Sequence, residues 1–192
     1  MVKPKILAFA GSTRSDSFNK KLVKIAASGA KDAGADVTVI DLRDFTMPLY
    51  DGDLEQKEGL PSNARKLKDL MISHHGFLIS SPEYNSSISG VLKNTIDWTS
   101  RPTEGEPPLA CFQGKVAGLM SASPGALGGL RGLVHVRSIL GNIGVLVTPH
   151  QVAISKAHEA FDADGALKDK KQEDQVKKVG IDVAHLLAKL VS

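Results

Sequence analysis

Five short apolar runs, separated by longer amphipathic segments, constrain the fold of this chain more than any other feature. The runs are Ile6–Ala10, Val37–Ile40, Gly76–Ser80, Val116–Met120 and Val145–Val147. Short continuous runs rich in Val, Ile and Leu are typical of strands that are buried on both faces of a parallel sheet. The pattern therefore predicts five such strands.

Amphipathic patterns with a helical period lie between these runs. Apolar residues fall near one helical face over residues 18–29, 64–71 and 176–190, and charged residues occupy the opposite face of the last segment. Strand and helix thus alternate, which predicts an α/β protein with a doubly wound, five-stranded parallel sheet and helices on both faces. Periodicity does not determine the strand order, so Rossmann-type and flavodoxin-type orders both remain open.

Size and composition narrow the classes of function. The 192 residues are enough for one hydrophobic core, and we expect one domain over residues 1–192. The only cysteine, Cys111, excludes a disulfide framework within the chain and a four-thiolate metal site. We expect it to be an inert, partly buried thiol, and we expect no metal. The net charge is only +3 and the lysines are scattered, which gives no reason to expect nucleic-acid binding. Because no run spans a bilayer and no secretory pattern is visible, we expect a cytoplasmic protein without a membrane partner.

Ligands of doubly wound folds bind at the carboxyl ends of the strands, which directs attention to three loops. The loop after the first run reads Gly11-Ser12-Thr13-Arg14-Ser15-Asp16-Ser17-Phe18-Asn19, with neither a G-x-G-x-x-G nor a Walker pattern. Amide groups at a helix start attract anions, hydroxyls add donors, and Arg14 adds a charged donor. The loop therefore favours a terminal phosphate, although Ser17 by itself is equally consistent with an ordinary N-cap.

The loop after the third run contains an aromatic ring and an amide side chain. It reads Ser81-Pro82-Glu83-Tyr84-Asn85-Ser86-Ser87-Ile88-Ser89-Gly90. Tyr84 offers a ring face and Asn85 offers a donor and an acceptor, which suits a flavin or a purine. Ser87 or Ser89 is expected to cap the next helix, whose Ile96 and Trp98 belong either to the core or to an oligomer interface. Glu83 has no identifiable acid–base partner, so we favour a structural role for it.

The loop after the fourth run reads Ser121-Ala122-Ser123-Pro124-Gly125-Ala126-Leu127-Gly128-Gly129-Leu130-Arg131. Its three glycines let backbone amides come close to a ligand. On the helix that follows, we interpret Arg137 as a surface charge and His135 as a half-buried, hydrogen-bonded histidine. His74 and His75, ahead of the third run, are interpreted as a polar turn.

Together the three loops resemble the NADPH-dependent FMN reductase family, a flavodoxin-like group that includes quinone, azo-dye and chromate reductases. The first motif is Gly11-Ser12-x-Arg14-x-x-Ser17-x-Asn19. The second is Pro82-Glu83-Tyr84-Asn85-x-Ser87, followed by Leu92-Lys93-Asn94-x-x-Asp97-Trp98. The third is Gly125-x-x-Gly128-Gly129-x-Arg131, with His135 and Arg137 beyond it.

The resemblance implies strand order 2-1-3-4-5, FMN as cofactor and NADPH or NADH as co-substrate. It implies a set of cofactor-binding residues: Ser12, Arg14, Ser17, Phe18 and Asn19 at the phosphate; Pro82, Glu83, Tyr84 and Asn85 along the isoalloxazine; and Ser121 with the loop containing Gly125 and Gly128 near its pyrimidine edge. It assigns no catalytic side chain, because the cofactor carries the chemistry.

The implied activity is hydride transfer from NAD(P)H to FMN and then to a small acceptor such as a quinone, flavin, azo dye or metal oxyanion. The implied assembly is a homodimer or homotetramer. A flavodoxin-type electron carrier is the main alternative, but such carriers are typically acidic and this chain is +3. A response-regulator module would need an acidic cluster after the first strand, which is missing. NADPH and NADH are not distinguished, and Arg14 and Arg131 are the only candidates for contacting a 2′-phosphate.

Overall fold

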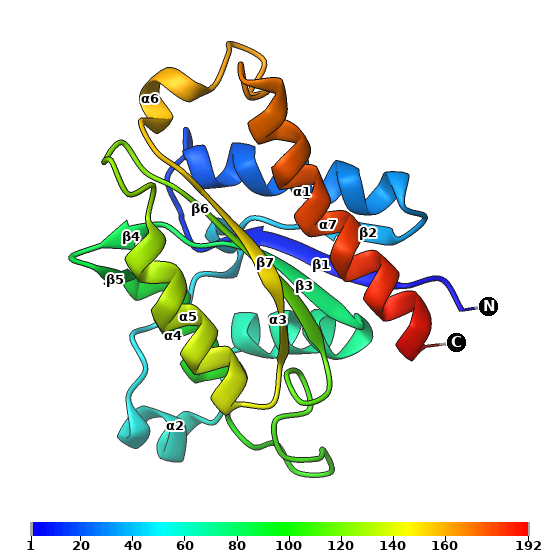
Figure 1. Cartoon of the computed structure of the whole chain (residues 1–192). Coiled ribbons are helices and arrows are strands. Elements are labelled where there is room, and N and C mark those ends of the chain that lie inside the picture. The colour runs from blue at the N-terminus through cyan, green and yellow to red at the C-terminus, as the bar shows by residue number, and fades with distance from the viewer. Residues whose placement is uncertain (1, 192) are drawn as a thin grey trace.

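The computed structural model describes residues 2–191 and contains one five-stranded parallel sheet. Across the sheet the strands follow the order β2 (Asp36–Val39), β1 (Lys5–Ala10), β3 (Gly76–Ser80), β6 (Val116–Ala122) and β7 (Leu146–Ile154). Counting only these strands, the order is 2-1-3-4-5, as the family resemblance implies (Figure 1).

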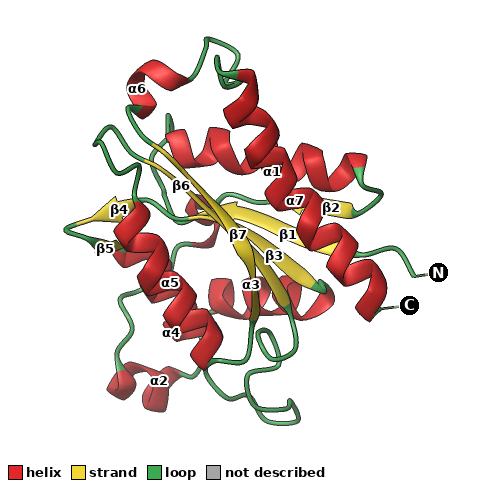
Figure 2. Cartoon of the chain, viewed as in Figure 1, coloured by secondary structure: helices red, strands yellow, loops and turns green. Residues whose placement is uncertain are grey.

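Helices cover both faces of the sheet (Figure 2). Helices α1 (Phe18–Asp32) and α7 (Lys170–Leu190) pack on one face. Helices α3 (Ser62–Ser73), α4 (Gly90–Thr99) and α5 (Leu130–Asn142) pack on the other. Alternate residues of a strand point to opposite faces, and in β1 Ile6 and Leu7 accordingly belong to different core clusters. This two-sided burial explains why the central strands read as continuous apolar runs.

Several short elements are not predicted by the sequence pattern. They are the 3-10 helix η1 (Leu42–Phe45), α2 (Gly52–Glu58), the antiparallel pair β4 (Glu83–Tyr84) and β5 (Ser87–Ile88), and α6 (Ala157–Ala160). Each is too short to show a period. Ser89 caps α4 through Leu92 N (3.2 Å), so of the two candidate caps Ser89 is the one used.

The two edge strands differ most from expectation. β2 is largely exposed rather than buried on both faces, because it has a neighbour on one side only. β7 runs to Ile154 instead of ending near Val147. Ala117 pairs with Val147 and Leu119 pairs with Gln151, so an advance of two residues in β6 matches an advance of four in β7, and β7 bulges around Pro149. Proline lacks the amide donor and is tolerated at a bulge or an edge, but it hides the strand in the sequence.

Arg137 is not a free surface charge, contrary to our interpretation. Its guanidinium donates to the Val147 carbonyl (3.3 Å), the Thr148 carbonyl (2.8 Å) and Gln151 Oε1 (3.0 Å). These acceptors lie at the bulge of β7, where the ladder is interrupted. Arg137 therefore ties α5 to the edge strand.

Trp98 belongs to the core. Its side chain is fully buried, Nε1 donates to the Pro48 carbonyl (2.8 Å), and its ring meets Tyr50 edge-on. Ile96 is also buried. These two residues therefore stabilise the fold of the chain, and they offer no surface to a partner subunit.

Helices α1 and α7 approach each other unusually closely, at two glycines. A Cβ on Gly29 would overlap the backbone of Lys177, and a Cβ on Gly180 would overlap the carbonyl of Ala26. The two glycines therefore set the helix separation. Within residues 2–191, no helix combines the length and the apolar character needed to cross a membrane.

Candidate functional site

A pocket of about 210 Å³ opens at the carboxyl ends of β1, β3 and β6. Eight residues selected from the sequence line it: Ser12, Arg14, Ser17, Phe18, Asn19, Pro82, Glu83 and Tyr84. The other lining residues are Ala122, Ser123 and Pro124, which follow β6 and were quoted in the third loop but not selected. The fold thus brings the first and second loops together, 63 or more residues apart in sequence, because parallel β1 and β3 are neighbours.

The amino end of α1 faces this pocket without a side-chain cap. Ser17 is the N-cap residue, yet its hydroxyl makes no cap hydrogen bond. The first amides of a helix have no partner within the helix, and a serine N-cap usually satisfies one of them. Ser17 is 5% exposed and lines the pocket, so its hydroxyl and the first amides of α1 are available to an anion.

The loop before α1 is held by its backbone. Gly11 N donates to the Ser80 carbonyl (2.9 Å), Ser89 Oγ donates to the Gly11 carbonyl (2.6 Å), and Arg43 Nε donates to the Thr13 carbonyl (2.9 Å). In contrast, the guanidinium of Arg14 forms no hydrogen bond or ion pair with residues 2–191. The backbone of the loop is therefore held in place, while the positively charged Arg14 side chain has no partner within residues 2–191.

Asn19 has a mainly structural role. Its Oδ1 accepts from Ser80 Oγ (2.8 Å) and from Ala122 N (3.0 Å), and its Nδ2 donates to the Ala122 carbonyl (2.9 Å). These bonds join the start of α1 to the ends of β3 and β6. One Nδ2 hydrogen is left for a ligand.

The second loop is a tight hairpin rather than an open turn. Asn85 and Ser86 connect β4 to β5 with φ values of 50° and 66°. A two-residue hairpin of this kind needs positive φ at both positions, which asparagine tolerates better than most residues. Asn85 lies outside the pocket lining, at the hairpin tip. Tyr84 precedes it and is 52% exposed, so its ring face is open.

Glu83 caps α5, whose N-cap residue Gly129 has no side chain to do so. Glu83 Oε2 accepts from Gly132 N (3.0 Å), and Oε1 accepts from Arg131 Nε (3.0 Å) and Nη2 (2.8 Å). Burial acts to raise the pKa of Glu83, but these hydrogen bonds outweigh burial and hold the pKa below its ordinary value. The structural role that we favoured for Glu83 is confirmed.

The third loop needs its glycines for packing. Gly128 has a φ of 62°, and a Cβ there would lie 2.7 Å from the carbonyl carbon of Ile154. A Cβ on Gly129 would overlap Ser121 Oγ. Ser121 is fully buried and its Oγ has no hydrogen-bond partner in the described part of the chain. Gly125 is exposed. Ser121, Gly125 and Gly128 lie outside the pocket lining, next to the residues that form it.

His135 and His74 both have hydrogen-bond partners. His135 is exposed rather than half-buried, and its Nδ1 lies 2.9 Å from Ser87 Oγ. His74 is buried, with Nδ1 2.6 Å from the Leu70 carbonyl and Nε2 2.9 Å from Thr38 Oγ1, so it is more than a polar turn. Among residues 2–191, no three His, Cys, Asp or Glu side chains are grouped so that they would hold a metal ion.

A family model described as NADPH-dependent FMN reductase matches residues 4–159. The chain belongs to this family. It is 36% identical over 173 residues to an NAD(P)H-dependent FMN reductase of Pseudomonas aeruginosa, covering 90% of this chain and 89% of that protein. It is 36% identical over 149 residues to a quinone reductase of Escherichia coli strain K12, covering 76% and 73%. A flavoenzyme NAD(P)H:(acceptor) oxidoreductase of Paracoccus denitrificans superposes with a TM-score of 0.81 at 27% identity, covering 97% and 98%.

As a member of the NADPH-dependent FMN reductase family, the chain is an oxidoreductase that uses FMN together with NAD(P)H. The family match supports an enzyme and not the alternative of a flavodoxin-type electron carrier. The donor set of the pocket also fits the cofactor, because an uncapped helix start, two hydroxyls and an uncommitted guanidinium suit a phosphate monoester.

Proposed function

We propose that this chain is a two-electron reductase of small quinone-type acceptors and that the pocket described above holds the FMN. The single observation that carries the placement is the amino end of α1, where Ser17 leaves its helix uncapped beside the uncommitted Arg14. A phosphate there would accept from the first helix amides, the Ser12 and Ser17 hydroxyls and the Arg14 guanidinium. Asn19 holds this helix start against β3 and β6.

The isoalloxazine is assigned to the side of the pocket formed by Pro82, Glu83 and Tyr84, next to Asn85. When bound, FMN supplies the hydride-accepting ring. Glu83 serves by anchoring the hairpin to α5, which fixes Tyr84 relative to the third loop. Ser121 and Gly125 support that loop. We assign no proton transfer to a side chain.

A pocket of about 210 Å³ encloses only part of such a cofactor. The remaining surface stays open on one side, which suits an enzyme that admits a nicotinamide nucleotide and then an acceptor at the same place.

We further propose that the protein works as a homodimer, or as a dimer of dimers, through the exposed side of α5. Leu130 and Val134 on α5 are 44% and 59% exposed, and Leu127 just before it is 51% exposed. Leu130 and Val134 are four residues apart on α5, so they lie on one face of the helix, beside the hairpin that carries Tyr84. Apolar stripes of this kind mark interaction sites. We place the enzyme in the cytoplasm, where its buried cysteine needs no oxidising compartment.

The catalytic proposal is tested by purifying the protein and following NADPH and NADH oxidation with a panel of acceptors: a benzoquinone, free FMN, an azo dye and chromate. We expect a yellow protein that releases FMN on acid treatment and whose kcat/KM is highest with the quinone. Colourless protein that ignores added FMN, or oxidation that no acceptor accelerates, would overturn it.

The assembly proposal is tested by light scattering at micromolar concentration. Wild type is expected to have the mass of a dimer or tetramer, and Leu130→Asp with Val134→Asp is expected to shift it to the monomer. Leu190→Asp is the matched control, because Leu190 is an apolar residue that is 57% exposed on α7, on the opposite face of the sheet from α5. A monomeric wild type, or equal behaviour of both variants, contradicts the proposal.

A further inference from the structure

A second pocket, of about 580 Å³, lies on the far side of the α1 amino end. It is formed between the first half of α1 and the segment that leads from β2 into η1. Its lining combines three lysines, an apolar floor and two carboxylates. The function proposed above does not use this pocket.

We propose that this pocket binds the 2′-phosphoadenosine end of NADPH. The proposal rests on the proposed function, because it assigns part of the same co-substrate. Three features carry it: a lysine without an ion-pair partner, an apolar floor beside a carboxylate, and a position next to the FMN pocket.

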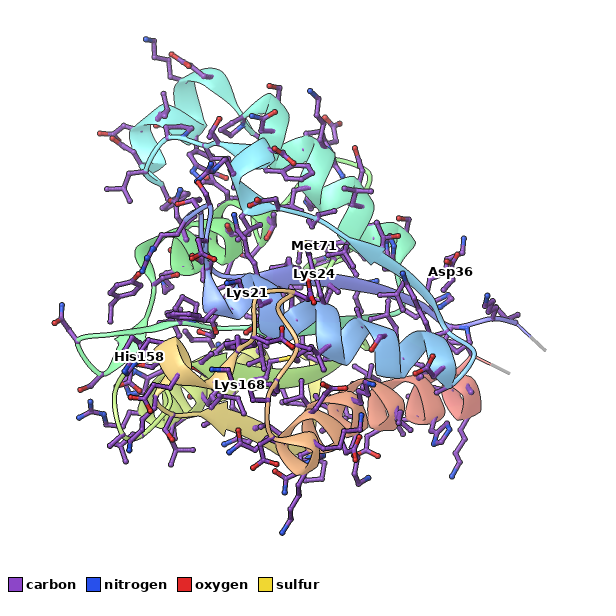
Figure 3. All side chains as sticks on the ribbon, turned by 90° about the horizontal axis from the view of Figure 1, so that it is seen from above. Lys21, Lys24, Asp36, Met71, His158 and Lys168 are labelled. Atoms are coloured by element: carbon purple, nitrogen blue, oxygen red, sulfur yellow. The ribbon has the colours of Figure 1, made fainter. Side chains whose placement is uncertain are left out.

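The lysines of the pocket are Lys20, Lys21 and Lys24, all on α1. Lys20 is paired with Asp41 (2.6 Å) and Lys21 with Asp16 (2.7 Å). Lys24 is exposed and forms no ion pair or hydrogen bond with residues 2–191. Figure 3 shows Lys21 and Lys24 close together on α1. Lys24 therefore offers a charge for a phosphate dianion, while Lys20 and Lys21 are each neutralised by a carboxylate.

The floor of the pocket suits a flat base. Val39 is 40% exposed, and Ile40 and Phe45 are partly buried. Apolar side chains with a few polar groups at the edge are the usual composition of a nucleotide-sized pocket. A purine on this floor would cover apolar surface that the fold leaves open to water.

The carboxylates explain why the pocket suits a nucleoside and not merely an anion. Asp41 is used internally, since it pairs with Lys20 and accepts from Arg43 N. Asp44 is exposed and has no partner in the described chain, so it is free to accept from a ribose hydroxyl. In NADPH that hydroxyl is the 3′-hydroxyl of the adenosine ribose, because the 2′ position carries the phosphate.

The pocket adjoins the proposed flavin site across the amino end of α1. Ser17 lines both pockets, so only the end of α1 separates them. A dinucleotide that places its nicotinamide at the flavin would have its adenosine end near this helix. The 2′-phosphate distinguishes NADPH from NADH, so Lys24 becomes a specificity-determining residue.

The experiment measures equilibrium binding of adenosine 2′,5′-bisphosphate and of 5′-AMP to the FMN-loaded protein by calorimetry. We expect wild type to bind the bisphosphate about tenfold more tightly than 5′-AMP, as one charge-assisted contact predicts. Lys24→Glu should abolish that preference while binding of 5′-AMP changes little. Raising the salt concentration should weaken binding of the bisphosphate more than binding of 5′-AMP, because the contact between Lys24 and the 2′-phosphate is exposed.

The matched control is Lys66→Glu, which makes the same charge change at an exposed lysine on α3, across the sheet. It should keep the wild-type preference. Steady-state kinetics should show the same pattern, with Lys24→Glu raising the KM for NADPH and leaving that for NADH unchanged.

The outcomes separate this inference from the proposed function. If the enzyme oxidises NADPH but the bisphosphate binds no better than 5′-AMP, or if Lys24→Glu and Lys66→Glu behave alike, the adenosine site is wrong and the reductase stands. If no reductase activity is found but Lys24-dependent binding persists, the site stands and the reaction is wrong.

Discussion

Glu83 and Arg131 are joined by two hydrogen bonds, from Nε (3.0 Å) and Nη2 (2.8 Å), although 48 residues separate them in the chain. The same carboxylate accepts from Gly132 N at the start of α5. A carboxylate at a helix amino end interacts favourably with the helix dipole as well as with the free amides. The hairpin that carries Tyr84 is thus fixed to the helix that follows the glycine loop.

Glu83→Gln is expected to lower the free energy of unfolding by about 1–2 kcal/mol at pH 7, chiefly through the bond to Gly132. The Arg131 guanidinium is 59% exposed, so its share is reduced by solvent screening. The folded-state pKa of Glu83 lies below the ordinary 4.5, so the contribution is present above pH 4.5 and is lost as the pH falls through the folded-state pKa.

Urea unfolding at several pH values between 3 and 7 measures this effect. The free energy of unfolding of wild type should exceed that of Glu83→Gln at pH 7, and the difference should disappear at the acid end of this range. Glu104→Gln, at an exposed carboxylate without an ion pair within residues 2–191, is the control and should differ little from wild type throughout. An advantage that persists unchanged at acid pH contradicts the capping role.

Arg14→Ala should weaken FMN binding about 10- to 150-fold, corresponding to one charge-assisted hydrogen bond of roughly 1.5–3 kcal/mol. The free energy of unfolding of the FMN-free protein should change by less than about 0.5 kcal/mol, because Arg14 has no hydrogen-bond or ion-pair partner in the described chain. Fluorescence titration with FMN and with riboflavin separates phosphate recognition from damage to the pocket. Riboflavin should bind both proteins equally, and a proportional loss of both ligands would remove Arg14 from the phosphate site.

Cys111 should make the native protein less stable in alkali. Burial raises the pKa of its thiol from 9.0 to about 11, and Sγ donates to the Thr99 carbonyl (3.1 Å). Between pH 9 and 11 the unfolded chain ionises first, so this contribution is present below pH 9 and is lost as the pH rises through about 11. The loss reaches about 2–3 kcal/mol, at 1.36 kcal/mol for each pKa unit.

The stability of Cys111→Ala should therefore fall less steeply over that pH range, as measured by urea unfolding. Parallel curves for the two proteins would exclude the effect. In addition, a thiol reagent at pH 8 should leave native protein unmodified and label one thiol per chain after unfolding.

Two glycines should respond to alanine in opposite directions. Gly180→Ala forces a Cβ into the Ala26 carbonyl, and overpacking of this kind should lower the free energy of unfolding by about 2 kcal/mol or more. Gly141, also helical, has open space where its Cβ would lie, so Gly141→Ala should stabilise the protein by about 0.5–1 kcal/mol. Thermal or urea unfolding checks both, and a neutral Gly180→Ala would show that α1 and α7 separate easily.

The sequence by itself determined the class of fold and indicated which loops form the candidate site. Apolar runs such as Ile6–Ala10 report burial on both faces, and their alternation with helical periods leaves few folds open. The loop motifs then predicted eight of the residues that line one pocket. Both follow from local chemistry, because burial and turn conformation act on neighbouring residues.

Only the tertiary structure decided which polar groups are already occupied. Asn19 and Ser17 look alike as ligands in the sequence, but Asn19 is largely used by Ser80 and Ala122, while Ser17 is left uncapped. Trp98 and Arg137 likewise acquired core and clamping roles from partners distant in the chain. The hydrophobic period of a segment indicates which of its positions are buried. The pairing of a donor with its acceptor depends instead on how separate elements pack against one another. That packing arises only when the whole chain has folded.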